Sequence, residues 1–251
     1  MSQFQIVSDL HIEYRTDKIP NPLDLITPKA ETLILAGDIG SFYKIKQLRG
    51  FLEQLCPYFK VVLYVPGNHE YYEQPGYEFQ TMQQLYENIL DVERDIPNLY
   101  ILNRACVRIE NVCIVGCTLW SEAKVRIPRF ILRIKDLSAT KYASKHNADL
   151  EYIKKMMDYC NKNNLKLLVV SHYCPTYNVI SNKRARDKYI SLYATDLDKY
   201  LSNEFVHTWV CGHIHENFDL ITDKGTRLVG NQKGKPKDKI TDFVKDKVIT
   251  V

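Results

Sequence analysis

Five short polar segments of the chain hold the residue types that bind metal ions and move protons. In chain order they are Ser8-Asp9-Leu10-His11, Gly37-Asp38, Gly67-Asn68-His69-Glu70, Ser171-His172 and Gly212-His213-Ile214-His215. Five of the 7 histidines lie in these segments, and only His146 and His207 lie outside them. Imidazole nitrogens with carboxylate and amide oxygens suit divalent Mn, Fe, Zn or Mg, whereas a thiolate set would favour zinc. The segments therefore indicate a site for divalent cations.

The spacing of these residues suits a pair of cations. In Asp9-Leu10-His11 and His213-Ile214-His215, alternate side chains of an extended segment point to the same side. A carboxylate such as that of Asp38 can bridge two metals about 3.5–4 Å apart. Such a pair lowers the pKa of a shared water and neutralises the charge of a phosphoryl group during an in-line displacement. Phosphate-ester hydrolysis is the chemistry that this spacing predicts.

Short apolar runs precede these polar segments. Residues 4–9, 32–38, 60–67 and 166–172 are expected to be strands buried on both faces. Apolar residues at helical spacing predict helices over 42–56, 77–94 and 144–161, and Thr195 is expected to cap a short helix through Ser202. This alternation predicts an α/β fold with mostly parallel strands, whose ends gather side chains from distant parts of the chain.

Two further stretches have the pattern of hairpins. Residues 106–120 are expected to turn at Glu110 and Asn111, and the region after Asn217 is expected to turn at 223–225. Parallel and antiparallel pairing should therefore coexist in two packed sheets. The Lys-rich residues 230–239 are expected to form a surface loop before a final strand at 247–251. Without an internal repeat or a long linker, one domain over 1–251 is expected.

Composition excludes several other classes of protein. Of the 251 residues 45% are hydrophobic and 25% are charged, which excludes collagen-like and disordered chains. The net charge of +4 selects neither a nucleic-acid nor a membrane partner. No stretch approaches the ~20 apolar residues of a membrane span, and the first residues lack the features of a signal peptide. The 7 cysteines form no CxxC pair, so we expect a cytoplasmic protein with reduced thiols.

The ordered set D-x-H, G-D, G-N-H-E, H and G-H-x-H, from Asp9 to His215, resembles the calcineurin-like metallophosphoesterases. The resemblance implies two packed mixed β-sheets flanked by helices, a four-layer α/β/β/α sandwich. It also implies two divalent metal ions, of which Mn²⁺ is the expected species and Fe, Zn or Mg are alternatives. One metal would be held by Asp9, His11, Asp38 and His215, and the second by Asp38, Asn68, His172 and His213. His69 would face the phosphate as a general acid or as a stabiliser of the leaving oxygen.

Departures from the family pattern narrow the class. Protein Ser/Thr phosphatases of this superfamily continue G-D with V-D-R-G and carry an Arg just before G-N-H-E. Here the sequences are GDIGSF and PGNHE, so both phosphate-binding arginines are missing. The chain is more similar to small single-domain phosphodiesterase-type members, in which an Asn-containing loop closes the domain. Asn231 is expected to cap the backbone in that loop.

Two basic segments are candidate substrate contacts. Residues 122–136 include Arg126 and Arg129, and residues 181–188 include Lys183 and Arg184. Clustered cations suit a nucleotide or nucleic-acid backbone, although a solvated surface is the alternative. Tyr173 is a further candidate contact, and with Tyr71, Tyr72 and Tyr177 it could stack a base or pack with a hydrated hydroxyl.

The function expected from these observations is hydrolysis of a nucleotide-like or other small phosphodiester by attack of a metal-bridging hydroxide, with Asp38 and His69 as the catalytic pair. Three alternatives stay open. One is a nuclease on single-stranded nucleic acid. Another is a phosphomonoesterase or protein phosphatase, and the third is a binding scaffold that keeps the fold without catalysis. The sequence indicates no membrane partner and does not define an oligomeric state.

Overall fold

The computed structural model describes residues 1–14, 18–182 and 184–251. Its first sheet has the strand order β11-β1-β2-β3-β4. The strands are β1 (Gln3–Val7), β2 (Thr32–Ala36), β3 (Val61–Val65), β4 (Leu99–Ile101) and β11 (Val248–Thr250). β1 to β4 run parallel, and β11 pairs antiparallel with β1. The predicted strands at 4–9, 32–38, 60–67 and 247–251 are confirmed.

The second sheet has the order β5-β6-β7-β8-β10-β9. Its strands are β5 (Ala105–Ile109), β6 (Val112–Cys117), β7 (Lys166–Ser171), β8 (Thr208–Val210), β9 (Phe218–Ile221) and β10 (Arg227–Gly230). The four central strands run parallel, while β5 pairs antiparallel with β6 and β9 with β10. Both predicted hairpins are therefore confirmed, and the sheet is mixed.

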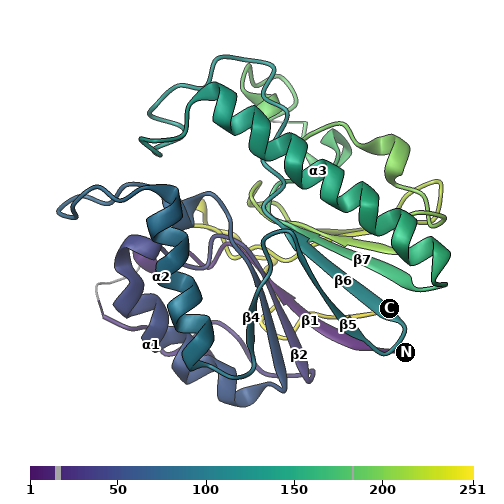
Figure 1. Ribbon diagram of the computed structural model, residues 1–251, viewed down its shortest axis with the longest axis horizontal. Helices are drawn as coiled ribbons and strands as arrows, with labels where there is room; N and C mark the ends of the chain where they lie inside the picture. Colours follow the sequence, from purple (N-terminus) through teal and green to yellow (C-terminus); the bar gives the residue numbers. More distant parts are fainter. Residues whose placement is uncertain (15–17, 183) are drawn as a thin grey trace.

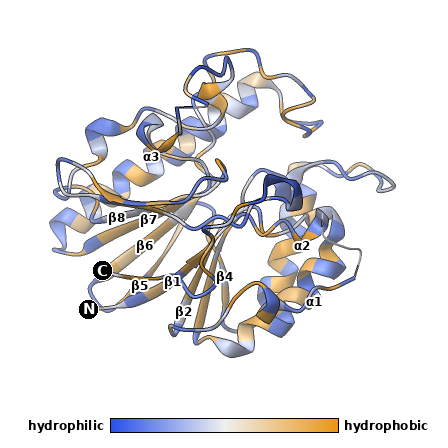
Figure 2. Cartoon of the chain, turned by 180° about the vertical axis from the view of Figure 1, so that it is seen from behind, coloured by the Kyte–Doolittle hydropathy of each residue, from blue (hydrophilic) through white to orange (hydrophobic). Residues whose placement is uncertain are grey.

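Helices cover the outer faces of both sheets. α1 (Ile45–Leu55) and α2 (Met82–Asp95) lie along the first sheet, and α3 (Ala139–Lys162) lies along the second (Figure 1). A cluster of buried apolar side chains from both sheets, including Phe4, Ile34, Ile114 and Val170, fills the space between them. Hydrophobic residues dominate the strands between the helical layers in Figure 2. The chain thus adopts the expected α/β fold of two packed mixed sheets flanked by helices.

Hydrogen bonds at the helix starts set their bounds. α2 begins at Met82, five residues later than expected, because the Thr81 hydroxyl accepts from the Gln84 N–H in a capping box. α3 begins at Ala139 rather than Ser144, since the Ser138 hydroxyl accepts from Lys141 N–H at 3.2 Å. The prediction of a helix from Thr195 to Ser202 is wrong. The Thr195 hydroxyl accepts instead from Glu122 N–H, and only a 3-10 turn forms.

Short 3-10 helices occupy many of the connections between strands and helices. Their bounds are Ile12–Tyr14, Pro22–Asp24, Phe42–Lys44, Cys56–Tyr58, His69–Tyr71, Tyr177–Val179, Ile190–Leu192, Asp198–Tyr200 and Pro236–Asp238. Two of these turns, at Ile12–Tyr14 and His69–Tyr71, directly follow or include residues of the polar segments. Among the described residues, no helix is long and apolar enough to span a membrane.

Residues 231–239, called the C-terminal loop below, differ from the predicted surface loop. Asn231, Gln232 and Gly234 are buried rather than exposed. The Asn231 amide donates to the Ile6 and Val244 carbonyls, both at 2.8 Å, which confirms its predicted backbone-capping role. This loop therefore packs against the carboxyl end of β1, where the first polar segment begins.

Candidate metal centre

The carboxyl ends of β1, β2, β3, β7 and β8 bring the five polar segments together at and beneath the floor of one cavity. Donor atoms of Asp9, His11, Asp38 and His215 lie within 4.8 Å of one another, and so do those of Asp38, His172 and His213. The imidazole Nε2 of His172 is 3.2 Å from Asp38 Oδ1 and 3.0 Å from Asn68 Oδ1. All seven predicted ligands thus come together, with Asp38 common to both clusters.

The donor set fits divalent cations. It consists of imidazole nitrogens, two carboxylates and one amide oxygen, without a thiolate, which is the combination that suits Mn, Fe, Zn or Mg. His11 Nε2 and His215 Nε2 lie 3.0 Å apart, and His215 Nε2 lies 3.2 Å from Asp9 Oδ1. Such close, buried donors repel one another unless a proton or a cation lies between them. The residues present therefore match the metal-dependent chemistry of the family that the sequence resembles.

Five of these residues adopt a backbone conformation that side chains rarely occupy. The φ angles are 54° at Asp9, 48° at His11, 54° at Asp38, 73° at His213 and 52° at His215. Left-handed residues other than glycine cost energy and persist only where the surroundings enforce them. The sequence predicted extended segments at residues 9–11 and 213–215, and that prediction is wrong. Tight turns there direct these side chains toward one another.

Glu70 holds two of the turns together. Its buried carboxylate accepts hydrogen bonds from the backbone N–H groups of Asp38 at 3.1 Å, Ile39 at 2.9 Å and Gly67 at 2.9 Å. The Tyr64 hydroxyl on β3 donates a fourth bond at 2.6 Å. The carboxylate thereby fixes the turn that carries Asp38 relative to the turn that carries Asn68 and His69.

His69 lies beside this centre with partners of its own. Its backbone N–H donates to Asp38 Oδ1 at 2.8 Å, and its ring stacks on Tyr72 with centroids 4.4 Å apart. Its Nδ1 faces the Tyr14 hydroxyl at 3.4 Å and Glu13 Oε1 at 3.5 Å. Burial lowers the pKa of His69 to about 4, so the imidazole is neutral at neutral pH. Glu13 and Tyr14, which sequence reasoning missed, thus set the orientation of this ring.

The imidazoles of the cluster divide into two kinds. Burial lowers the pKa of His11 and of His213 to about 3. Burial also opposes protonation of His172 and His215, but nearby carboxylates outweigh it. Asp38 raises the pKa of His172 to about 10, and Asp238 with Asp9 raises that of His215 to about 9. Without metal, two of the four imidazoles therefore carry protons at pH 7.

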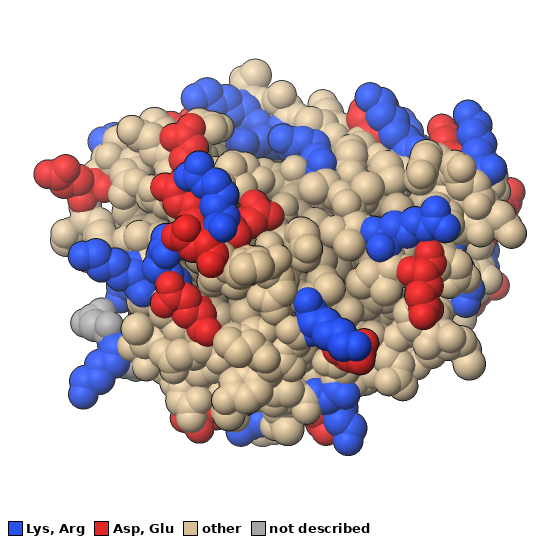
Figure 3. All heavy atoms as spheres, turned by 60° about the horizontal axis from the view of Figure 1, so that its bottom comes forward, with Lys and Arg blue, Asp and Glu red and all other residues tan. Residues whose placement is uncertain are grey.

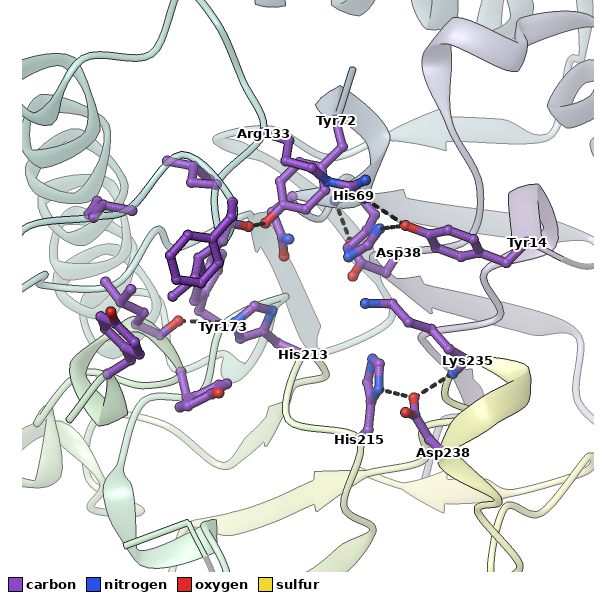
Figure 4. Close-up of a pocket in the computed structure, with 18 of the residues that line it drawn as sticks. Tyr14, Asp38, His69, Tyr72, Arg133, Tyr173, His213, His215, Lys235 and Asp238 are labelled. Atoms are coloured by element: carbon purple, nitrogen blue, oxygen red, sulfur yellow. Dashed lines mark hydrogen bonds and ion pairs between the residues drawn. The ribbon is translucent and has the colours of Figure 1, made fainter. Parts of the chain in front are cut away.

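A cavity of about 790 Å³ opens above the cluster and contains a lysine that the sequence did not single out. Lys235 extends from the C-terminal loop into the space between His215 and the side that carries His69 and Asp38 (Figure 4). Its ammonium lies 5.7 Å from the centroid of the Tyr14 ring. Burial lowers the pKa of Lys235, while Asp38, Asp238 and two more carboxylates act against that shift. The prediction that this Lys-rich stretch stays on the surface is thus wrong for Lys235.

The C-terminal loop also supports a candidate ligand directly. Asp238 Oδ2 accepts from His215 Nδ1 at 2.6 Å and from the Lys235 backbone N–H at 2.8 Å. Gln232 Oε1 accepts from the His215 backbone N–H at 2.6 Å. A carboxylate on the far nitrogen of a ligating histidine fixes its tautomer and ring orientation. The only sequence signal for these contacts was the polar composition of the loop.

Of the four predicted substrate contacts, two line the cavity and two do not. Tyr173 lines the cavity, but it is buried and packs on His213 with ring centroids 4.0 Å apart. Arg184 also lines the cavity, with its guanidinium bonded to the Ile214 carbonyl and 3.4 Å from Glu216. Arg126 and Arg129 are exposed and do not line the cavity, whereas Arg133 from the same segment does. Lys183 lies outside the described residues.

The other residues that the sequence singled out lie around or beyond the site. Tyr72 lines the cavity, whereas Tyr71 is buried among the side chains between the helices and the first sheet. Tyr177 packs in the cluster beneath α3. His146 is buried with its Nδ1 against the Trp120 carbonyl, and His207 Nδ1 lies 2.9 Å from the Thr208 hydroxyl. Both histidines outside the polar segments thus have local structural partners.

Comparisons with known proteins agree with this geometry. The family model described as calcineurin-like phosphoesterase matches residues 3–217, and the chain belongs to that family. A curated relative, an uncharacterized protein of Acanthamoeba polyphaga mimivirus, is 26% identical over 272 residues, which cover 93% of this chain and 91% of that protein. The C-terminal loop lies beyond the matched residues of the family.

Solved structures show the same fold at low identity. A phosphopantetheinyl hydrolase from Mycobacterium tuberculosis matches with a TM-score of 0.69 and 16% identity, covering 96% of this chain and 94% of that chain. A dimetal phosphatase from Danio rerio matches with a TM-score of 0.55 and 13% identity, covering 92% and 87%. The family and the fold thus define a phosphoesterase with a candidate metal-binding site.

Proposed function

We propose that this chain is a dinuclear metal-dependent phosphodiesterase. The observation that carries the proposal is the buried carboxylate of Asp38, which belongs to both clusters of donor atoms at the floor of the cavity. One cation would be held by Asp9, His11, Asp38 and His215, and the other by Asp38, Asn68, His172 and His213. Two cations bound there would lower the pKa of a shared water and neutralise phosphoryl charge. We propose Mn²⁺ as the metal and one domain over 1–251.

The side chains around this centre have separate roles in the proposal. Asp38 positions both ligand sets, and its Oδ1 also holds the His69 backbone at 2.8 Å. His69 donates a hydrogen bond from its imidazole to the leaving oxygen, with Glu13 and Tyr14 fixing the ring. Lys235 supplies a cation to a phosphoryl oxygen, a contact that the two arginines of the protein phosphatases would otherwise make. Both residues line the cavity, and in the proposal both contact the substrate.

Two observations support a diester over a monoester as the substrate. The volume of about 790 Å³ accommodates groups on both sides of phosphorus. In addition, two of the four cationic side chains that line the cavity, Arg133 and Arg184, already have partners, at Tyr14 and at Ile214 with Glu216. A doubly charged monoester would need more free cationic contacts than a singly charged diester. Cytoplasmic location remains part of the proposal, consistent with seven free cysteines.

The test is a panel assay with the Mn²⁺-loaded protein. It compares bis-p-nitrophenyl phosphate, p-nitrophenyl phosphate, cyclic nucleotides and single-stranded nucleic acid. Diester hydrolysis well above monoester hydrolysis supports the proposal, and the reverse order contradicts it.

The matching variant is Asp38→Asn. We expect loss of turnover with loss of both metals, because one carboxylate serves both clusters. The variant should still fold, since Asn tolerates the left-handed φ of 54° that Asp38 adopts. Metal content by mass spectrometry and thermal unfolding measure the two effects, with exposed Asp158→Asn as the control. Full metal content with unchanged activity would contradict the proposed role of Asp38 as a ligand of both metals.

A nuclease is the second candidate function, since the two basic segments, 122–136 and 181–188, each contribute an arginine to the lining of the cavity. On the face drawn in Figure 3, however, Lys and Arg side chains are interspersed with Asp and Glu. Ionic strength separates the two functions. Nuclease activity should fall steeply as salt increases, because binding a strand releases counterions, whereas hydrolysis of a small diester should change little.

A further inference from the structure

One side of the cavity is apolar and aromatic, and neither the family nor the metal ligands explain it. It is formed by Ile127, Phe130, Ile131, Tyr189, Leu192 and Tyr193, called the aromatic wall below. These residues come from two long connections, the one between β6 and α3 and the one between β7 and β8. Both connections are the segments whose lysines and arginines suggested a phosphate backbone. In the structure they present these apolar side chains to the cavity, together with Arg133 and Arg184.

The aromatic wall extends from the metal centre to the mouth of the cavity. At its inner end, the Tyr193 ring lies 6.0 Å from the His213 ring, and the Leu192 carbonyl is 3.0 Å from His213 Nε2. At its outer end, Phe130 meets Tyr189 edge-to-face with centroids 6.4 Å apart. Asp187 joins the two ends, accepting from Tyr189 N–H at 2.8 Å and lying 3.3 Å from the Tyr193 hydroxyl. A group attached to phosphorus at the centre would therefore lie along this surface.

Phe130 is the residue of the aromatic wall that a bound ligand would cover. Its side chain is 76% exposed although it lines the cavity, so a large apolar ring faces water. An exposed aromatic ring next to a concave apolar surface is typical of ligand sites, where a flat group covers both. The lining also includes Lys235, Lys237 and Asp238, which come from the C-terminal loop and not from the two connections. The C-terminal loop therefore adds charged groups to the cavity, and the two connections supply its aromatic wall.

Three cations of the two connections have partners within the protein. Arg133 donates to the Tyr14 hydroxyl at 2.7 Å, and its guanidinium lies 5.1 Å from the Tyr72 centroid. Arg184 lies 5.5 Å from the Tyr193 centroid, and the Lys188 ammonium lies 4.8 Å from that of Tyr189. These contacts give all three cations partners within the protein, and Arg184 and Lys188 lie against rings of the aromatic wall itself. A nucleic-acid strand, which needs a row of free cations along its phosphates, does not match it.

We propose that the aromatic wall is a subsite for one flat aromatic group esterified to the scissile phosphate. The proposal rests on the phosphodiesterase function and names its substrate class, an aryl or nucleoside phosphodiester. The ring packs against Phe130 and Tyr189, and the phosphate lies between the metal centre and Lys235. Aromatic contacts of this kind bind any nucleobase or aryl ring, because they do not depend on hydrogen bonds to a particular ring.

Binding and turnover test the subsite separately. With the Mn²⁺-loaded protein, phenylphosphonate and methylphosphonate are compared by calorimetry, because they share the anionic head and differ only in the ring. Turnover is compared for p-nitrophenyl phenyl phosphate and methyl p-nitrophenyl phosphate, which share a leaving group. We expect about a 10-fold preference for the phenyl member of each pair. Adenosine 5′-monophosphate against ribose 5-phosphate then shows whether the ring accepted is a nucleobase.

The variants are Phe130→Ala and Tyr189→Ala, with Phe205→Ala as the control. Phe205 is 38% exposed and does not line this cavity, so its variant should keep the preference. Each cavity variant should lose most of the preference for phenyl compounds and keep its affinity for methylphosphonate. Equal binding of the two phosphonates by the unaltered protein, or a preference that survives both substitutions, would overturn the proposal. A phenylphosphonate preference in a protein that hydrolyses neither diester would refute the phosphodiesterase function and leave the subsite standing.

Discussion

His69 illustrates how much of the candidate site depends on single side chains outside the proposed ligand sets. It is 5% exposed, and its ring lies within 4.6 Å of the His11 ring and 4.4 Å of the Tyr72 ring, centroid to centroid. Glu13 lies between both imidazoles, 3.1 Å from His11 Nδ1 and 3.5 Å from His69 Nδ1. One buried carboxylate therefore orients a candidate ligand and the candidate leaving-group contact together.

Replacing His69 should separate catalysis from metal binding. For His69→Ala we expect kcat to fall by about 10²–10⁴-fold, the usual loss when a proton or hydrogen-bond donor to the leaving group is removed. Metal content should not change, because His69 is not among the proposed ligands. Steady-state kinetics with bis-p-nitrophenyl phosphate and metal analysis measure the two effects, and His207→Ala is the matched control. An unchanged kcat would remove His69 from the mechanism.

Lys235 should act on phosphate rather than on metal. For Lys235→Met we expect inorganic phosphate to inhibit about 10- to 100-fold more weakly, since a charge-assisted contact to the anion is lost. Lys239→Met is the control, because Lys239 is on the same loop, is exposed and does not line the cavity. Inhibition constants for phosphate check the expectation. If both variants bind phosphate as the unaltered protein does, Lys235 has no role in anion binding.

At the scale of elements, Glu70 connects the turn after β2 with the turn after β3. In Glu70→Gln, one of the two oxygens that accept hydrogen bonds becomes an NH₂ group, which cannot accept from the backbone N–H groups. We expect the free energy of unfolding to fall by roughly 1–3 kcal/mol, the cost of leaving a buried donor without a partner. Urea unfolding of the metal-free protein measures this loss. Exposed Glu53→Gln should change it little, and equal stabilities for both variants would contradict the role given to Glu70.

The elements that could be predicted from the sequence are those whose own residues determine them. The strands at 32–38, 60–67 and 166–172 are continuous apolar runs, and burial on both faces made them readable. The helix expected from Thr195 did not form, because the Thr195 hydroxyl bonds to Glu122 N–H, a residue 73 positions away. Such long-range competition leaves no trace in local spacing.

The candidate site likewise contains residues that could be predicted from the sequence and residues that could not. Its candidate ligands could be predicted from residue types and their order along the chain, and the ends of parallel strands bring these residues together. Lys235, Asp238 and Phe130 were missed because their roles come from where loops fold, which charge composition does not encode. Arg126 and Arg129 show the converse, since a basic sequence segment placed its apolar members, such as Ile127, in the cavity.

At the scale of the whole molecule, the candidate metal centre draws its residues from both sheets. Asp9, His11, Asp38 and Asn68 follow strands of the first sheet, and His172, His213 and His215 follow strands of the second. Each proposed metal site therefore takes ligands from both sheets. Cations bound there would connect the two halves of the sandwich as well as activate substrate.

Metal affinity should rise with pH. In the metal-free protein His172, with a pKa of about 10, and His215, with a pKa of about 9, are protonated at pH 7, and both must lose the proton to ligate. Between pH 6.5 and 8.5 we expect Mn²⁺ affinity to increase about 10-fold per pH unit for each proton displaced. Calorimetry in buffers of different ionisation enthalpy counts the protons released. A pH-independent affinity would contradict the assignment of both ligands.

The same protons predict how stability depends on pH without metal. Both folded-state pKa values lie above the ordinary value of 6.5, so protonation stabilises the fold fully below that pH. This contribution is lost as pH rises toward 9 and 10. Thermal unfolding of the metal-free protein should therefore show a falling midpoint over this range.

The left-handed backbone at Asp9, His11, Asp38, His213 and His215 has a consequence for how this protein would change under selection. Each such residue costs about 1–3 kcal/mol, and glycine would relieve that cost while removing a proposed ligand. A library selected only for resistance to heat, in the absence of metal, should therefore accumulate glycine at these five positions early. Under that selection the proposed metal ligands would be lost while the two sheets around them became more stable.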